Sequence, residues 1–256
     1  MSISILKASV ISKIAAGEVV ERPASVVKEL LENSLDAGAR TVSVDIVGSG
    51  LSIIKVSDDG DGIPAREVEL AFSRHATSKL DSETDLESIQ TLGFRGEALA
   101  SIAAVSQVEL VTRFATEDTG VRLLLMSGQL KDRKSIGVPS GTVIQVENLF
   151  YNVPARLKFL NSEATERGLT KRIVSKYAMA YPHVRFSFVS EKRQGFQSYG
   201  NGNLLDVLST IYGVDIAGKM LDISTLEQDN IAVSGLVSMP DLSRSNRQEI
   251  SFFINI

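Results

Sequence analysis

The stretch Glu29-Leu30-Leu31-Glu32-Asn33 decides which fold this sequence predicts. It lies within residues 23–38, which begin with a proline suited to the first turn of a helix and end with a glycine suited to its C-terminal cap. Glu29 and Asn33 are four residues apart, so both side chains leave the same face of the predicted helix. A carboxylate beside a carboxamide suits a general base next to a metal ligand, although such pairs are also common on solvated helix faces.

An acidic turn with two glycines, Asp58-Asp59-Gly60-Asp61-Gly62, follows a predicted strand over residues 51–56. Glycine allows positive φ and lets a ligand approach the backbone closely. A carboxylate fixed at a strand end can accept a hydrogen bond from an exocyclic amine, such as that of adenine. The ligand pattern of an EF-hand calcium loop fails here, because residues 63–65 interrupt it. A plain surface turn remains the alternative.

A third motif, Leu92-Gly93-Phe94-Arg95-Gly96, leads into an alanine-rich helix. Backbone N–H groups at a helix start favour a phosphate, although an ordinary glycine turn is an equal interpretation. Upstream, Thr77-Ser78-Lys79 lies in a polar segment that could close over a triphosphate as a lid. The Walker A pattern occurs nowhere in the chain, so this would be a different kind of phosphate site. A fourth and weaker feature is Thr142, at the start of a predicted strand.

These four features, in this order, resemble the GHKL ATPase superfamily, which includes gyrase-type topoisomerases, the large heat-shock chaperone, histidine kinases and MutL. Longer stretches are similar to the MutL mismatch-repair family in particular, namely residues 14–30, 33–39, 74–79, 93–99 and 149–160. The resemblance covers essentially the whole chain and is densest over residues 14–160.

The resemblance implies an α/β fold in which residues 1–200 form the GHKL ATP-binding domain. Its sheet should be mixed and largely antiparallel, with helices on one face. Residues 201–256 should begin a second α/β domain, truncated here, that resembles the ribosomal-protein-S5-like fold. Periodicity and turn residues add a β-hairpin over 41–56, a short helix over 65–72, a long helix over 162–180 and a linker at 200–203. Further strands are predicted near residues 105–113, 121–126, 142–147, 184–189, 195–199, 231–237 and 250–254.

The same resemblance implies that the chain binds ATP with Mg²⁺. Glu29 would activate the attacking water, Asn33 would ligate Mg²⁺, and Asp58 would accept the adenine amine. The other nucleotide-binding residues that it implies are Asp36, Ala37, Gly60, Gly62, Thr77, Ser78, Lys79, Leu92, Gly93, Phe94, Arg95, Gly96 and Thr142.

The implied function is slow ATP hydrolysis in DNA mismatch repair. Nucleotide would close a lid over residues 74–96 and, with the arm Met1–Val20, create the surface for a second copy of the chain. This switch would couple mismatch recognition by a MutS-type protein to downstream repair. The alternatives are another GHKL ATPase of the topoisomerase or chaperone type, and an ATP-binding switch without turnover.

Two departures from the family pattern affect these expectations. Asp59 stands where the family usually has Asn, which concerns local hydrogen bonding. The family's late lysine, which reaches the ATP phosphate from the second domain, has no counterpart before Ile256. We therefore expect a partial chain, with weak dimerisation and without full ATPase activity on its own.

Composition limits the other possibilities. With 256 residues, 43% hydrophobic and 23% charged, the chain is of ordinary globular type, and its net charge of −4 argues against a surface coated in positive charge. The absence of cysteine excludes disulfides and thiolate metal sites, and two histidines are too few for a histidine-based zinc site. No signal peptide or membrane span is indicated, so a cytoplasmic protein is expected.

One basic region lies between residues 156 and 176. Its cations outnumber its acids, and the candidates for contact with a DNA backbone are Arg156, Lys158, Lys171 and Arg172. A solvated helix face explains the same charges, and no interleaved aromatic residues support base stacking.

Overall fold

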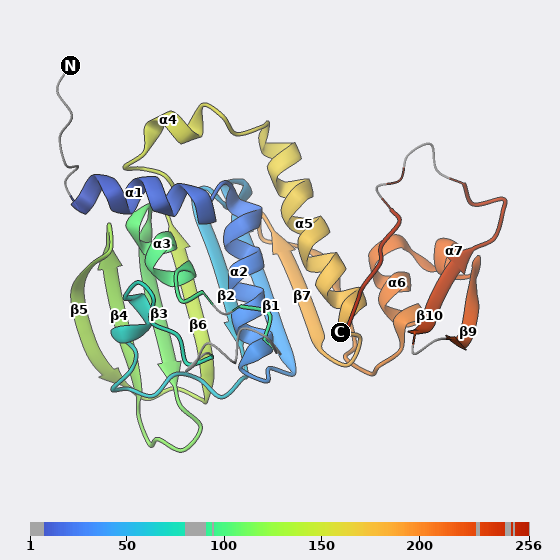
Figure 1. The fold of residues 1–256 in the computed structure, drawn as a ribbon, viewed down its shortest axis with the longest axis horizontal. Helices are drawn as coiled ribbons and strands as arrows, with labels where there is room; N and C mark the ends of the chain where they lie inside the picture. Colours follow the sequence, from blue (N-terminus) through green and yellow to red (C-terminus); the bar gives the residue numbers. More distant parts are fainter. Residues whose placement is uncertain are drawn as a thin grey trace.

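The computed structural model describes residues 8–79, 91–93, 95–228, 231–243, 247 and 249–255 (Figure 1). Its helices are α1 (Ala8–Val19), α2 (Pro23–Asp36), α3 (Ala98–Ala104), α4 (Pro154–Leu157), α5 (Glu163–Ala180), α6 (Leu204–Tyr212) and α7 (Val214–Ala217), with short 3-10 turns η1 (Gly48–Gly50) and η2 (Leu70–Phe72). Its strands are β1 (Thr41–Val47), β2 (Ile53–Asp58), β3 (Gln107–Arg113), β4 (Gly120–Met126), β5 (Gln129–Ile136), β6 (Gly141–Glu147), β7 (Arg185–Ser190), β8 (Arg193–Gln197), β9 (Met220–Gln228) and β10 (Ile231–Ser238).

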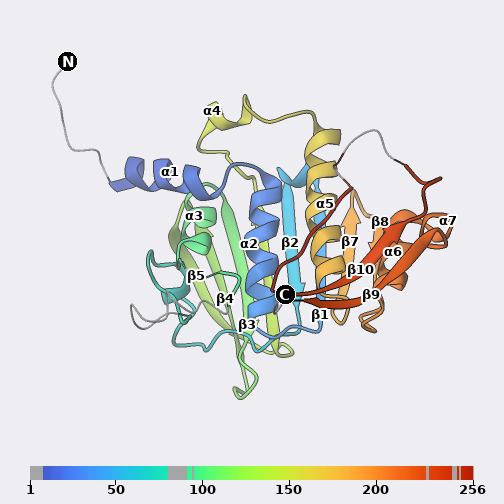
Figure 2. The ribbon, with the colours of Figure 1, turned by 45° about the vertical axis from the view of Figure 1, so that its right-hand side comes forward.

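Within these ranges the first eight strands form one sheet in the order β5-β4-β3-β6-β2-β1-β7-β8. The pair β1 and β7 is parallel, and every other neighbouring pair of this sheet is antiparallel. Helices α1, α2, α3 and α5 lie over one face of the sheet (Figures 1 and 2). The predicted mixed, largely antiparallel sheet with helices on one face is therefore confirmed.

The core lies between this sheet and the helices. Strand β1 alternates as a half-buried strand should, and its inward residues Val42, Val44 and Ile46 are fully buried. Helix α2 meets them with an apolar stripe formed by Val26, Val27, Leu30 and Leu31. Each fully buried side chain of this kind contributes about 1.5–3 kcal/mol, so the stripe fixes how α2 is rotated on the sheet. The opposite residues of α2 are then presented away from the strands.

Two glycines let the turn after β2 approach its neighbours closely. A Cβ on Gly60 would lie 2.7 Å from the carbonyl oxygen of Ala37, at the end of α2. Gly62 has a φ of +75°, and a Cβ there would overlap the carbonyl oxygen of Arg113. Side chains at these positions would push the acidic turn away from α2 and β3, so glycine is what places this turn beside the helix.

Two predicted elements are wrong and two strands are missing from the prediction. Residues 65–72 form turns that end in η2, and the backbone N–H of Ala65 donates to the distant Glu117 carboxylate. Residues 250–254 are not in a strand. Strand β5 is an exposed edge strand rich in charge, so it carries no alternating apolar signal, and β9 was also missed.

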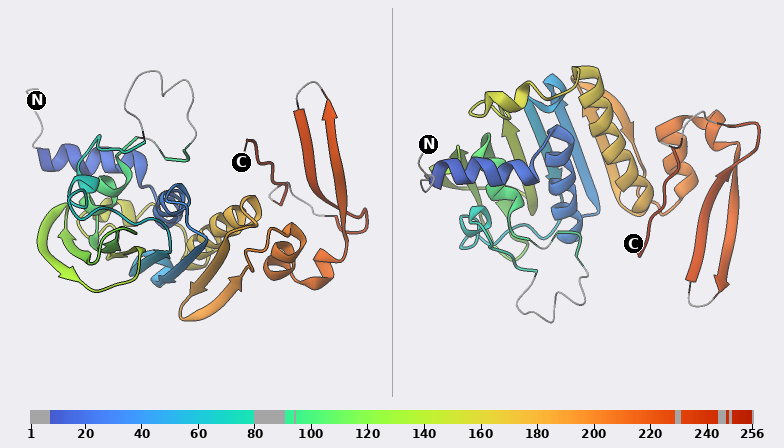
Figure 3. Two further views of the ribbon diagram at one scale, coloured as in Figure 1. Left: turned by 90° about the horizontal axis from the view of Figure 1, so that it is seen from below. Right: turned by 45° about the horizontal axis from the view of Figure 1, so that its top comes forward.

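The residues after β8 begin with α6, whose Val207 is buried in the main core. Asn203 caps α6 by accepting hydrogen bonds from the backbone of Leu205 and Asp206. Strands β9 and β10 pair with each other in a separate two-stranded sheet that projects from the rest of the chain (Figure 3). A division of the chain at residue 200 stays a prediction. In the part of the chain that the structure describes, no helix has both the length and the apolar character needed to cross a membrane.

Candidate nucleotide-binding site

Helix α2 carries three of the predicted residues, Glu29, Asn33 and Asp36, along its length. The Glu29 side chain is 25% exposed, and its carboxylate lies 3.5 Å from the Lys28 ammonium. Burial raises the pKa of the Glu29 carboxyl above its ordinary value, and the neighbouring Lys28 opposes this shift only in part. A carboxylate whose basicity is raised, but which still reaches solvent, has the properties of a general base.

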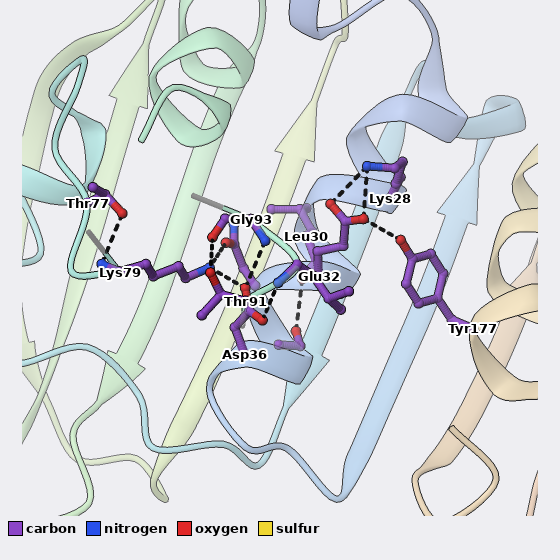
Figure 4. Close-up of polar contacts among 12 residues, drawn as sticks. Lys28, Leu30, Glu32, Asp36, Thr77, Lys79, Thr91, Gly93 and Tyr177 are labelled. Atoms are coloured by element: carbon purple, nitrogen blue, oxygen red, sulfur yellow. Dashed lines mark hydrogen bonds and ion pairs between the residues drawn. The ribbon is translucent and has the colours of Figure 1, made fainter. Parts of the chain in front are cut away.

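The C-terminal half of α2 binds a lysine from the segment before residue 80 (Figure 4). Lys79 Nζ donates to Asn33 Oδ1 at 3.1 Å and to Asp36 Oδ2 at 2.5 Å. The two side chains of this ion pair are 20% and 8% exposed. Two oxygens of α2 therefore already converge on a positive charge.

The glycine motif reaches the same carboxylate. The backbone N–H of Leu92 donates to Asp36 Oδ1 at 2.9 Å, and that of Gly93 donates to Asp36 Oδ2 at 3.1 Å. Thr91 Oγ1 donates to the Gly93 carbonyl at 3.1 Å (Figure 4). Asp36 thus ties both the lysine segment and the glycine motif to the end of α2.

The two candidate phosphate-binding segments also contact each other. The backbone N–H of His75 donates to the Gly96 carbonyl at 3.0 Å, and a Cβ on Gly96 would lie 2.5 Å from the carbonyl oxygen of Ala76. Thr77 Oγ1 accepts from the backbone N–H of Lys79 at 3.1 Å. Ser78 lies in the same short segment, and Arg95 lies next to Gly96. The prediction for Phe94 lies outside the described residues.

Asp58 lies at the end of β2 and is surrounded by donors. Its Oδ2 lies 2.8 Å from Ser34 Oγ, and its Oδ1 accepts from the backbone N–H of Gly60 at 3.0 Å and of Thr142 at 3.3 Å. Burial raises the pKa of the Asp58 carboxyl, and these three donors offset part of that rise. The carboxylate is therefore fixed in orientation before any ligand binds.

Asp59 turns away from this arrangement. Its Oδ1 accepts from the backbone N–H of Arg40 at 2.8 Å and of Thr41 at 2.7 Å, which closes the turn between α2 and β1. Burial acts to raise the pKa of Asp59, but the backbone donors outweigh it and lower the pKa. Both hydrogen bonds go to one oxygen, which an amide could supply equally well. The presence of Asp59 where the family usually has Asn therefore affects the hydrogen bonds of the turn between α2 and β1.

The ligand oxygens at the end of α2 fit a magnesium ion that is held chiefly by the phosphates of a nucleotide. Among the residues that the structure describes, no group of three or more His, Cys, Asp or Glu side chains could hold a metal by itself. Mg²⁺ commonly keeps several waters and takes one or two protein oxygens together with substrate phosphates. Asn33 Oδ1, next to the Lys79 ammonium, is such an oxygen.

Sequence reasoning missed Ser34 and a network around Glu32. The side chain of Glu32 is buried, and its carboxylate accepts from Lys28 Nζ at 2.9 Å and from Tyr177 Oη at 2.5 Å. The four-residue spacing of Lys28 and Glu32 was a usable signal for one of these contacts. No local pattern indicated Tyr177, which comes from α5.

The basic residues divide into different roles. The Arg156 guanidinium donates to the Val20 carbonyl at the end of α1 and lies over the Phe150 ring at 5.8 Å. Lys158 and Arg172 are exposed. Lys171 and Arg172 line a groove between α5 and α6. Arg156 therefore has a structural role in holding the end of α1.

Comparison with known proteins gives the family. Residues 21–153 match the model described as "Histidine kinase-, DNA gyrase B-, and HSP90-like ATPase", and residues 208–256 match "DNA mismatch repair protein, C-terminal domain". The DNA mismatch repair protein MutL of Limosilactobacillus reuteri (strain DSM 20016) is 50% identical over 244 residues, which cover 95% of this chain and 36% of that protein. MutL of Desulforamulus reducens is 48% identical over 254 residues, or 99% of this chain and 40% of that protein.

The chain thus spans well under half the length of these curated relatives. Among solved structures, the Aquifex aeolicus MutL ATPase domain complexed with ADP superposes with a TM-score of 0.64 at 33% identity, covering 80% of this chain and 72% of that one. The resemblance drawn from the motifs is confirmed. The chain belongs to the histidine kinase-, DNA gyrase B- and HSP90-like ATPase family, within its DNA mismatch repair MutL branch.

Proposed function

We propose that this chain binds ATP with Mg²⁺ and, as part of a DNA mismatch repair protein, hydrolyses it slowly to drive a conformational switch. The observation that carries the proposal is the convergence at α2. At the end of this helix, Asn33 and Asp36 bind the Lys79 ammonium, and Asp36 also accepts from the backbone N–H groups of residues 92 and 93. Asp58 lies beside the same helix, where its carboxylate is hydrogen-bonded to Ser34. The structure of the Aquifex aeolicus MutL ATPase domain complexed with ADP supports nucleotide binding by this family.

In this proposal Asp58 accepts a hydrogen bond from the adenine amine. Its donors Gly60 and Thr142 hold the carboxylate in place, and Gly62 and Ala37 shape the wall on either side. Guanine presents a carbonyl where adenine presents the amine, so the same carboxylate disfavours GTP.

The phosphates would lie toward Lys79 and the glycine motif. An ammonium and backbone N–H groups are the donors that phosphate oxygens use in proteins. The remaining residues proposed for this part of the site are Thr77, Ser78, Leu92, Gly93, Phe94, Arg95 and Gly96. Asn33 would hold Mg²⁺, which supplies neutralisation of the phosphate charge when bound.

Glu29 is proposed to take a proton from the attacking water. Its position one helical turn before Asn33 places the base on the same face of α2 as the metal ligand. Burial of its carboxyl raises the basicity of Glu29, which makes proton acceptance from water more favourable.

Replacement of Glu29 by alanine tests the proposal. Glu29→Ala should abolish ATP turnover and leave nucleotide affinity within about twofold, because the base acts on water and not on the bound nucleotide. Phosphate release and calorimetry, in a protein of the length of its curated relatives, measure the two quantities. The exposed Glu163→Ala on α5 is the matched control. Turnover at the wild-type rate in Glu29→Ala would exclude Glu29 as the base.

We further propose that nucleotide binding brings together two copies of the chain, and that the whole protein works with a MutS-type mismatch-recognition protein and with DNA in the cytoplasm, at the nucleoid. The DNA contacts would be weak and independent of sequence. Lys158, Lys171 and Arg172 are the candidates that support this, whereas Arg156 serves the α1 contact.

A further inference from the structure

A buried carboxylate next to the proposed site has no role in the mechanism above. Glu32 lies on α2, and its residue is only 7% exposed. A buried carboxylate is costly unless charged or hydrogen-bonding partners compensate it. Lys28 Nζ at 2.9 Å and the Tyr177 hydroxyl at 2.5 Å supply that compensation (Figure 4).

The lysine in this network also contacts the proposed base. Lys28 Nζ lies 3.5 Å from Glu29 Oε1, so one ammonium is shared between Glu32 and Glu29. The Lys28 side chain is 45% exposed, and a lysine side chain on its own is flexible. The buried Glu32 carboxylate is therefore what keeps the ammonium beside Glu29.

The third member of the network comes from a different helix. The Tyr177 ring, on α5, stacks on Tyr181 with a centroid distance of 6.4 Å and an interplanar angle of 9°. Burial and the hydrogen bond to Glu32 raise the pKa of the Tyr177 hydroxyl, so it stays a donor. A fixed donor from α5 fixes the orientation of the Glu32 carboxylate.

We propose that Lys28 is a positioning residue for Glu29, and that the Tyr177–Glu32 hydrogen bond holds Lys28 in place for it. The inference rests on the role of Glu29 proposed above. The ammonium keeps the Glu29 carboxylate charged and limits its rotamers, while α5 supplies the anchor from outside the nucleotide pocket. The network leaves nucleotide binding to other residues, so it acts on turnover and not on affinity.

The expected pH effect has a definite sign. The charged and titratable groups near Glu29 are Lys28 and Glu32 on α2, Lys79 from the segment beside it and Tyr177 on α5. Of these, Lys28 is the strongest influence that lowers the Glu29 pKa. Its removal should raise that pKa further, so the activity profile should be displaced to higher pH relative to the unmodified protein.

The decisive comparison is Lys28→Met against Lys28→Arg. Lys28→Met keeps an apolar stem but removes the charge, and it should lower kcat at pH 7 by about tenfold, with unchanged nucleotide affinity and an activity profile displaced to higher pH. Lys28→Arg keeps the charge and should restore most of kcat. Tyr177→Phe should give a smaller loss of the same kind. Tyr181→Phe removes a hydroxyl from the stacked neighbour and should have no effect.

A second measurement is independent of turnover. A carbon-13 titration of the Glu29 carboxyl in the folded chain should give a higher pKa for Lys28→Met than for the unmodified protein and for Lys28→Arg. Melting curves verify that each variant is folded. An unchanged carboxyl titration in Lys28→Met, equal losses in the Met and Arg variants, or equal losses in Tyr177→Phe and Tyr181→Phe would overturn the inference. Turnover that survives in Glu29→Ala would instead overturn the proposed function, so the two failures are distinguishable.

Discussion

At the scale of single residues, two adjacent acids after β2 have separate tasks. Asp58 is held by Ser34, Gly60 and Thr142 and faces the proposed adenine position, whereas Asp59 binds two backbone N–H groups of the preceding turn. Because each carboxylate already has its donors, neither can take over the task of the other.

Replacement of Asp58 should therefore weaken nucleotide binding specifically. Loss of one buried polar partner typically costs about 1–3 kcal/mol, so Asp58→Ala should reduce ATP affinity by roughly 10- to 100-fold. Calorimetry measures this, with Asp59→Asn as the control that keeps its single accepting oxygen and should bind normally. Unchanged affinity in Asp58→Ala would mean that adenine binds against another wall. GTP should bind weakly to the unmodified protein.

The raised pKa of Asp58 adds a dependence on pH. Because burial favours the neutral carboxyl, Asp58 should protonate at a higher pH than an ordinary aspartate as the solution is acidified. Protonation removes an acceptor, so ATP affinity should fall in that range. Calorimetry across this pH range should show a step in ATP affinity for the unmodified protein, and this step should be absent from Asp58→Asn. A step of the same size in Asp58→Asn would assign it to another group.

At the scale of elements, alanine substitutions at two glycines should change the free energy of unfolding in opposite directions. Gly62 has positive φ and no space for a Cβ, so Gly62→Ala should lower the free energy of unfolding by more than about 1 kcal/mol. Gly168 lies inside α5, and a Cβ added there would meet nothing within 4 Å, so Gly168→Ala should raise the free energy of unfolding by roughly 0.5–1 kcal/mol. Denaturant unfolding measures both. A stabilised Gly62→Ala protein would contradict the close approach of the acidic turn to β3.

At the scale of the whole molecule, the end of α2 joins segments that are far apart in sequence. Asp36 and Asn33 hold Lys79 on one side, and Asp36 holds residues 92 and 93 on the other. Asp36 is the residue that both segments share, so a ligand that displaces the Lys79 ammonium from Asp36 would act at the contact that also holds residues 92 and 93. We propose that these shared contacts link nucleotide binding to closure of the two segments, and through closure to association of two copies.

Hydrogen exchange tests that route. Addition of Mg²⁺ and a non-hydrolysable ATP analogue should slow exchange over residues 74–79 and 91–96, and sedimentation should detect association of two copies. Equal exchange in both states would defeat the lid proposal. Slower exchange without association would restrict the proposal to local closure, as expected if further residues of the second domain are needed for a stable dimer.

The candidate site was predictable where its signals are local. Glu29 and Asn33 are set on one face of α2 by helical periodicity, and the acidic turn and the glycine motif are marked by residues that only such turns require. The hairpin of β1 and β2 was predictable too, because β1 alternates between apolar and polar positions and glycines mark the turn, whereas the arrangement of the whole sheet was implied by the family resemblance. The helix over 65–72 was not predicted correctly, because this segment forms turns that end in η2.

The sequence by itself determined α2, the order of the nucleotide motifs and the antiparallel hairpin of β1 and β2, because each depends on residues close together in the chain. Only the tertiary structure decided that Ser34 supports Asp58, that Lys79 lies against Asn33, and that Tyr177 reaches Glu32. These contacts join residues separated by 24, 46 and 145 positions. Their partners are selected by how the helices pack on the sheet, and no local propensity encodes that choice.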